Sequence, residues 1–153
     1  MYTVEQSKIL DIPELLEIAV QYWKETETYS QRPLNLNKVK TQLQTLILLP
    51  TLGTVLIVKD QQGKILGGYI GGLQEEWMTD SLMAFDYCMF VRPECRGSRV
   101  AYLLIQAFIE WAKKQGCHFI QCGTATQINT EKTINFYKKI GFEHTGSFLE
   151  LYL

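Results

Sequence analysis

Three of the four arginines in this 153-residue chain, Arg92, Arg96 and Arg99, lie within eight positions of one another. They occupy a polar turn between an apolar run that ends at Val91 and an apolar-periodic stretch that ends at Gly116. A turn from a strand into a helix presents unpaired backbone N–H groups and the positive end of the helix dipole at one point. Guanidinium groups bind phosphate oxygens through paired hydrogen bonds. The turn therefore predicts a site for a phosphate-bearing ligand.

The elements on either side of this turn would position it. The β-rich run of residues 81–91 predicts a buried strand, and Ser98–Gln115 shows the helical spacing of an amphipathic helix. Upstream, Tyr2–Ser7 predicts a strand, and Asp11 with Glu14 has the spacing of a capping box at the start of a helix. A polar loop or bend over Glu25–Asn37 and a second helix over Leu36–Leu48 follow.

A glycine-rich β-hairpin precedes the arginine turn. Gly53–Lys59 and Lys64–Leu73 are β-rich runs joined by a turn sequence that ends in Gly63. The paired glycines of the second run suggest a nucleotide-binding loop, but no helix follows them, as the dinucleotide fingerprint requires. We predict instead a bulged or closely approached strand.

Downstream of the arginine turn, Cys117–Cys122 predicts a short strand and Thr130 or Asn129 caps a helix to about Ile140. Phe142–Leu153 predicts one or two closing strands. The element order indicates one domain over residues 1–153, of mixed α/β (α+β) class with helices on both faces of the sheet.

Composition excludes several functions. A net charge of −1 does not support binding of nucleic acid over a broad surface, and no apolar run is long enough to span a membrane. The four cysteines form no CxxC pair, so we expect free thiols and no metal site. No signal peptide is visible, and a cytoplasmic location is expected.

Two motifs resemble the GNAT superfamily of acyl-CoA-dependent N-acyltransferases. The first is Val91-Arg-Pro-Glu-Cys-Arg96-Gly97-Ser98-Arg99-Val100-Ala101, and the second is Thr133-Ile-Asn-Phe-Tyr137-Lys-Lys-Ile-Gly-Phe142. The likeness covers nearly the whole chain. It implies a mixed, mostly antiparallel central sheet of about seven strands, with acetyl-CoA as the acyl donor and no metal.

The resemblance also implies where acetyl-CoA binds. The backbone of Phe90 and Val91 would pair with the pantetheine arm as an added strand. Arg99 replaces the central glycine of the family motif, and it retains the backbone amide if its φ is helical. The pyrophosphate would be held by amides and side chains of Arg96, Gly97, Ser98, Arg99, Val100 and Ala101.

Two residues are the catalytic candidates. Tyr137 matches the family's general acid, which protonates the departing CoA thiolate; the alternative is a core aromatic with a satisfied hydroxyl. Asp86 is a carboxylate in an apolar strand, where burial would raise its pKa and make it a general base. The alternative for Asp86 is a strand carboxylate that is paired or points to solvent.

The sequence predicts transfer of the acetyl group to a small-molecule or peptide amine by direct attack in a ternary complex. Acidic residues near Tyr29, Glu75 and Trp77 favour a cationic acceptor, and these three are the substrate-binding candidates. A non-catalytic acyl-CoA-binding or regulatory domain of the same fold is the alternative, and a nucleic-acid module is the weakest hypothesis. Exposed strand edges in this fold often pair, so a homodimer is one expectation.

Overall fold

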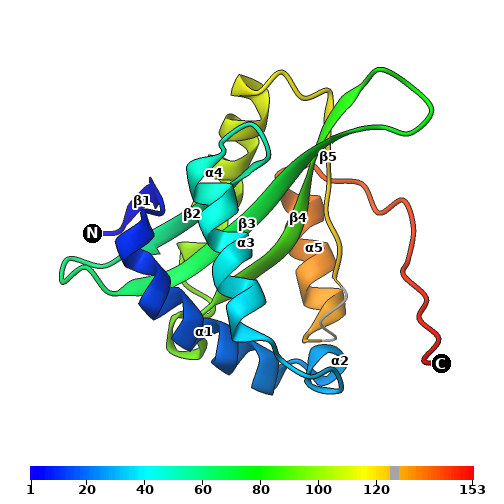
Figure 1. Cartoon of the computed structure of the whole chain (residues 1–153). Helices are drawn as coiled ribbons and strands as arrows, with labels where there is room; N and C mark the ends of the chain where they lie inside the picture. Colours follow the sequence, from blue (N-terminus) through cyan, green and yellow to red (C-terminus); the bar gives the residue numbers. More distant parts are fainter. Residues whose placement is uncertain (125–127) are drawn as a thin grey trace.

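The computed structural model describes residues 1–124 and 128–153, and in these it contains one five-stranded sheet covered by helices (Figure 1). None of the described helices is long and apolar enough to span a membrane. The strands are β1 Thr3–Gln6, β2 Gly53–Lys59, β3 Ile65–Glu75, β4 Leu82–Val91 and β5 Phe119–Gln121. The helices are α1 Ile12–Glu25, α2 Glu27–Ser30, α3 Leu36–Leu48, α4 Val100–Lys114 and α5 Thr130–Ile140, with short 3-10 turns η1 Ile9–Asp11 and η2 Pro93–Cys95.

The five strands lie in chain order across the sheet. Neighbouring strands from β1 to β4 are antiparallel, whereas β5 runs parallel to β4. The prediction of about seven strands was wrong, because residues 142–153 form no strand. β5 is only three residues long and offers little edge for pairing. The tail is attached instead through side chains, as the contacts of Glu150 and Tyr152 with residues 28–32 show.

Helices cover both faces of the sheet, as predicted. Side chains of successive strand residues point to opposite faces. Accordingly, Val55 and Ile57 of β2 pack with α1 and α3, while Leu56 and Val58 pack with α4 and with Tyr137 of α5. All four β2 side chains are buried, which is why this strand reads as a continuous apolar run.

The glycines of β3 allow close approach, as predicted, and the strand pair is also bulged. A Cβ atom at Gly71 would lie 2.2 Å from Cε2 of Phe108, so no larger residue fits beneath α4. The register shifts here: Ile70 lies opposite Cys88 and Gly71 opposite Asp86, so β4 contains one extra residue, Tyr87.

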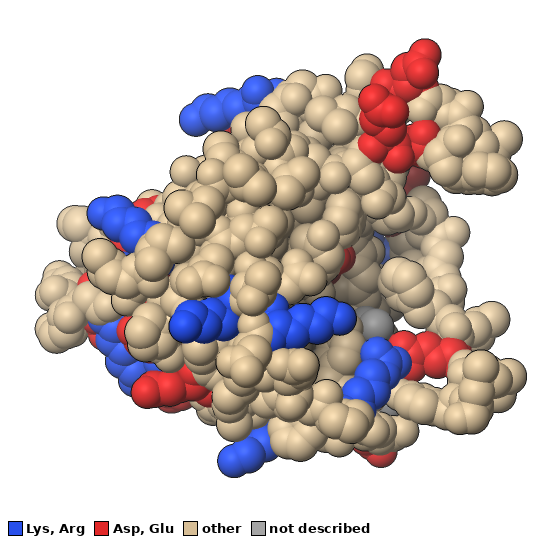
Figure 2. All heavy atoms as spheres, viewed as in Figure 1, with Lys and Arg blue, Asp and Glu red and all other residues tan. Residues whose placement is uncertain are grey.

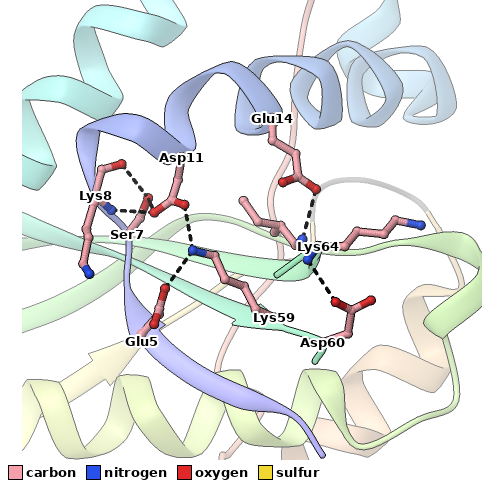
Figure 3. A network of polar contacts seen from close by, with 9 residues as sticks. Glu5, Ser7, Lys8, Asp11, Glu14, Lys59, Asp60 and Lys64 are labelled. Atoms are coloured by element: carbon pink, nitrogen blue, oxygen red, sulfur yellow. Dashed lines mark hydrogen bonds and ion pairs between the residues drawn. The ribbon is translucent and has the colours of Figure 1, made fainter. Parts of the chain in front are cut away.

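The predicted capping box is replaced by a network of polar contacts between α1 and the sheet. Asp11 makes no side-chain cap to α1; its carboxylate accepts from the backbone N–H of Lys8 and pairs with Lys59 at 2.8 Å (Figure 3). Glu14 reaches the backbone N–H of Ile65 on β3 (Figure 3). These carboxylates fasten the start of α1 to the strands beneath it.

Candidate active site

The two parallel strands β4 and β5 separate immediately before Asp86. They pair from Met83 opposite Phe119 to Phe85 opposite Gln121, and among the described residues the pairing ends there. Asp86 is therefore the first residue of β4 in the opening between the strands, and its Oδ1 accepts a hydrogen bond of 3.2 Å from the N–H of Gly123. The bulge at the next residue increases the local divergence.

Asp86 is a partly buried carboxylate without a cationic partner in the described chain. Removal from water raises its pKa to about 6, and the hydrogen bond from Gly123 opposes this shift only in part. Within the described residues Asp86 forms no ion pair, and it is only partly exposed to solvent. A carboxyl group with this pKa can accept a proton near neutral pH.

Tyr137 projects from α5 toward the same opening. Its side chain is 6% exposed and lies edge-on to Phe142 at 5.1 Å between ring centroids. Burial raises the pKa of Tyr137 well above its usual value, and the neighbouring Cys122 and Asp86 raise it further. The phenol therefore stays protonated at neutral pH.

The sequence analysis did not identify two further residues of this cluster. Tyr22 of α1 and Cys88 of β4 both have a raised pKa, mainly through burial, and the charge of Asp86 contributes to both shifts. The signal for Tyr22 was its spacing from Leu15 and Ile18 on the apolar face of α1. Cys88 is one of the four cysteines for which the sequence predicts only a free thiol.

A cavity of about 300 Å³ lies between α5 and the C-terminal tail. Tyr137 lines it together with Cys122 of the strand end and Phe148 of the tail. The candidate general acid thus borders a space that can admit a small molecule.

Unpaired backbone amides gather at the N-terminus of α4. Within the described chain, the N–H groups of Gly97, Arg99, Ala101 and Tyr102 donate no hydrogen bond to the protein. Gly97 has a φ of 85°, a conformation suited to glycine, and Arg99 has a helical φ of −75°. The amide at Arg99 is therefore retained although its side chain differs from the motif glycine. This donor set fits a pyrophosphate.

Two of the three arginines in the turn form ion pairs with glutamates of α1. The guanidinium of Arg92 binds Glu14 at 2.8 Å and donates to the carbonyl of Ile65, so this arginine is engaged within the protein. Arg96 pairs with Glu25 at the end of α1, at 2.5 Å, and its Nε donates to the Val91 carbonyl at 3.2 Å.

The remaining candidates fall into two groups. Beyond Phe85, the backbone of β4 that includes Phe90 and Val91 pairs with no described strand on the β5 side, which is where an added strand would pair. Tyr29 of α2 lies near Asp86 and Cys88, whose charges raise its pKa after the larger effect of burial.

Glu75 and Trp77 lie apart from this cluster. Glu75 is opposite Leu82, four residues from Asp86 along β4, a separation of about 13 Å for an extended strand. Trp77 is 88% exposed at the tip of the β3–β4 hairpin. Figure 2 shows acidic side chains gathered at this tip, which carries Glu75, Glu76 and Asp80.

Solved structures with the same fold include several acetyltransferases. A Trypanosoma brucei acetyltransferase is 19% identical over 100% of both chains, with a TM-score of 0.76. The enzyme AAC(6')-Iy, solved with the bisubstrate analogue CoA-S-monomethyl-acetylneamine, is 18% identical over 100% of this chain and 98% of its own, with a TM-score of 0.79. Glucosamine-6-phosphate N-acetyltransferase from Arabidopsis thaliana is 12% identical over 99% and 98%, with a TM-score of 0.77.

At these identities the structural likeness shows the fold alone. No curated protein sequence matches the chain. The sequence profile of the acetyltransferase (GNAT) family, however, matches residues 12–142, which include β4, the arginine turn and α5. The chain therefore belongs to the acetyltransferase (GNAT) family.

Proposed function

We propose that this protein transfers the acetyl group of acetyl-CoA to a primary amine by direct attack within a ternary complex. The observation that carries the proposal is that a partly buried carboxyl with a raised pKa, Asp86, contacts Gly123, which lines the same cavity as the buried and protonated phenol of Tyr137. Two titratable groups whose environments favour opposite proton states are what an acid–base mechanism requires.

The donor would be held by the features around the arginine turn. The free amides from Gly97 to Tyr102 would bind the pyrophosphate, and Arg96 would add a charge-assisted contact after leaving Glu25. The unpaired backbone at Phe90 and Val91 would pair with the pantetheine arm. Acetyl-CoA supplies the thioester whose acetyl group is transferred.

Asp86 would take a proton from the acceptor ammonium, directly or through one water, so that the nitrogen can attack. Backbone N–H groups where the strands separate would stabilise the oxyanion that develops on the acetyl carbonyl. Tyr137 would donate its proton to the sulfur as the carbon–sulfur bond breaks. The two residues act on opposite sides of the reacting carbon.

The acceptor is proposed to be a cationic amine. Two structural neighbours are named for amine substrates, an aminosugar phosphate in one case and an acetylneamine analogue in the other. Here Tyr29 and Asp86 border the opening, and both suit a positive group. Glu75 and Trp77 remain candidates only for an acceptor long enough to reach the hairpin.

The proposal is tested in two steps. Calorimetric titration with acetyl-CoA and with CoA establishes donor binding, and steady-state assays with a panel of primary amines then establish transfer. We expect micromolar donor binding and acetylation of cationic amines. Donor binding without transfer to any amine would support the non-catalytic acyl-CoA-binding alternative, and absence of donor binding at millimolar concentration would contradict both.

A further inference from the structure

The side chain of Arg32 lies between two tyrosine rings. Its guanidinium carbon is 5.5 Å from the ring centroid of Tyr29 and 5.6 Å from that of Tyr152. One nitrogen, Nη2, donates to Glu150 Oε2 at 2.9 Å and to the hydroxyl of Tyr152 at 3.3 Å. Two aromatic faces and a carboxylate form the kind of site that recognises organic cations. We call Tyr29, Tyr152 and Glu150 together the cation site.

The cation site joins segments that are far apart in the sequence. Figure 1 shows the C-terminal tail running from α5 toward α2, and the Tyr152 hydroxyl donates to the carbonyl of Thr28 at 3.3 Å. Tyr29 also packs toward the interior, because its ring lies 6.0 Å from the ring of Tyr22 on α1. Asp86 contributes to the raised pKa of Tyr29 after the larger effects of burial and Cys88, which agrees with a place for the cation site near the opening between β4 and β5.

The backbone at Arg32 is fixed without the help of its side chain. The indole Nε1 of Trp23 donates to the carbonyl of Arg32 at 2.8 Å, and the N–H of Arg32 donates to the carbonyl of Tyr29 at 3.0 Å. The pair between Arg32 and Glu150 is open to water, with side-chain exposures of 45% and 40%. Exposed ion pairs are weak, so the guanidinium can leave while the turn keeps its shape.

We propose that the cation site binds a second positive group of the acceptor, and that Arg32 fills this site in the free protein. The inference rests on the proposed function. It names the acceptor class as a primary amine that carries a further ammonium or guanidinium group. The reacting amino group would reach Asp86 while the second cation displaces the Arg32 side chain from Glu150.

The test compares 1,5-diaminopentane with 1-aminopentane, which differ only in the second amino group. We expect kcat/KM to favour the diamine by about three- to tenfold, the range for an exposed cation–π contact with a carboxylate. Glu150→Gln should remove most of this preference. Glu110→Gln on α4 makes the same charge change at an exposed position away from the opening, and it should retain the preference. Equal effects of the two variants would overturn the proposal.

A second variant tests whether Arg32 occupies the site or builds it. Arg32→Gln removes the internal cation, so the diamine should bind more tightly than it does to the unaltered protein. Weaker binding would mean that Arg32 holds the tail in place for the ligand, and the proposed displacement would be wrong.

Binding measured without turnover separates this inference from the proposed function. Titration of the diamine into protein saturated with CoA reports the cation site alone. Acetylation of both amines at equal efficiency would overturn the cation site and leave the acetyltransferase standing. Diamine binding that depends on Glu150, without acetylation of any amine, would support the site and contradict the proposed reaction.

Discussion

Two aspartates of this protein, the buried Asp11 and the partly buried Asp86, have opposite surroundings. Asp11, at the start of α1, is contacted by Lys59 Nζ at 2.8 Å, by the N–H of Lys8 at 2.7 Å and by Ser7 Oγ at 3.4 Å. Burial opposes its ionisation, but these contacts together hold its pKa below the usual value of 3.8. Asp86 accepts a hydrogen bond from the N–H of Gly123 and contacts no cation in the part of the chain that the structure describes, and burial raises its pKa to about 6.

The difference separates a structural carboxylate, Asp11, from the proposed general base, Asp86. Asp11 is ionised throughout the physiological range, and its charge fastens α1 to β2. Ionisation of Asp86 lowers the stability of the folded protein, because its surroundings do not compensate for the lost hydration. Such a loss of stability is typical of groups that transfer protons. Neutralising each aspartate should therefore have opposite effects on stability and unequal effects on activity.

The largest effect is expected from Asp86→Asn on activity. Loss of a general base reduces kcat/KM by about 10²–10⁴-fold. In the unaltered protein kcat/KM should fall as pH drops below about 6, where Asp86 takes up a proton, and the residual activity of the variant should lack this decline. Steady-state rates between pH 5 and 8 measure both. A variant that keeps full activity would remove Asp86 from the mechanism.

The same substitution should make the folded protein more stable at neutral pH. The folded-state pKa of Asp86 lies above its unfolded value, so the cost of ionisation is absent below pH 3.8 and complete above about pH 6. At pH 7.5 the gain from Asp86→Asn is at most about 2–3 kcal/mol of unfolding free energy, reduced by whatever the new amide leaves unpaired. Urea denaturation at pH 7.5 and pH 4 should show the gain shrinking at the lower pH.

Tyr137→Phe should act on catalysis with a smaller loss. The phenol gives up its proton only as the carbon–sulfur bond breaks, so kcat should fall by about 10²-fold while KM changes little. The ring packing against Phe142 is retained, and the melting temperature serves as the control. An unchanged kcat would return Tyr137 to a purely structural role.

Asp11→Asn should show the reverse pattern. The substitution leaves Glu5 as the only carboxylate paired with Lys59 among the described residues. The unfolding free energy at pH 7 should therefore fall by about 2 kcal/mol, whereas kcat/KM should be unchanged. The pKa of Asp11 is lower in the folded than in the unfolded state, so its contribution is present above pH 3.8 and lost as pH falls through the folded pKa. Denaturation with and without the substitution at pH 7 and pH 3 measures this; a loss that grows on acidification would contradict the assignment.

The sequence predicted the environment of Asp86 better than it predicted the contacts of Asp11. A carboxylate in an apolar strand is a local signal, and burial explains its pKa. Asp11 has the spacing of a helix cap, but its actual partner, Lys59, lies 48 residues away and no local pattern reveals it. The prediction of closing strands was wrong for a related reason. Residues 142–153 include side chains that favour β-strands, but a strand also needs the edge of another strand to pair with, and β5 provides only three residues. The Arg32 contacts with the tail depend on the same long-range placement.

The smallest effect is expected from a variant that tests whether the ion pair between Glu25 and Arg96 competes with acetyl-CoA for the Arg96 side chain. Arg96 is held by Glu25, with side-chain exposures of 40% and 27%, in contrast to the well-buried carboxylate of Asp11. Because such a pair is weak, Glu25→Gln should free Arg96 and tighten acetyl-CoA binding by about two- to fivefold. Glu17→Gln, an exposed position on α1 without an ion pair in the described chain, is the matched control. If calorimetry shows that Glu25→Gln weakens binding, then Glu25 positions Arg96 for the pyrophosphate instead of competing with it.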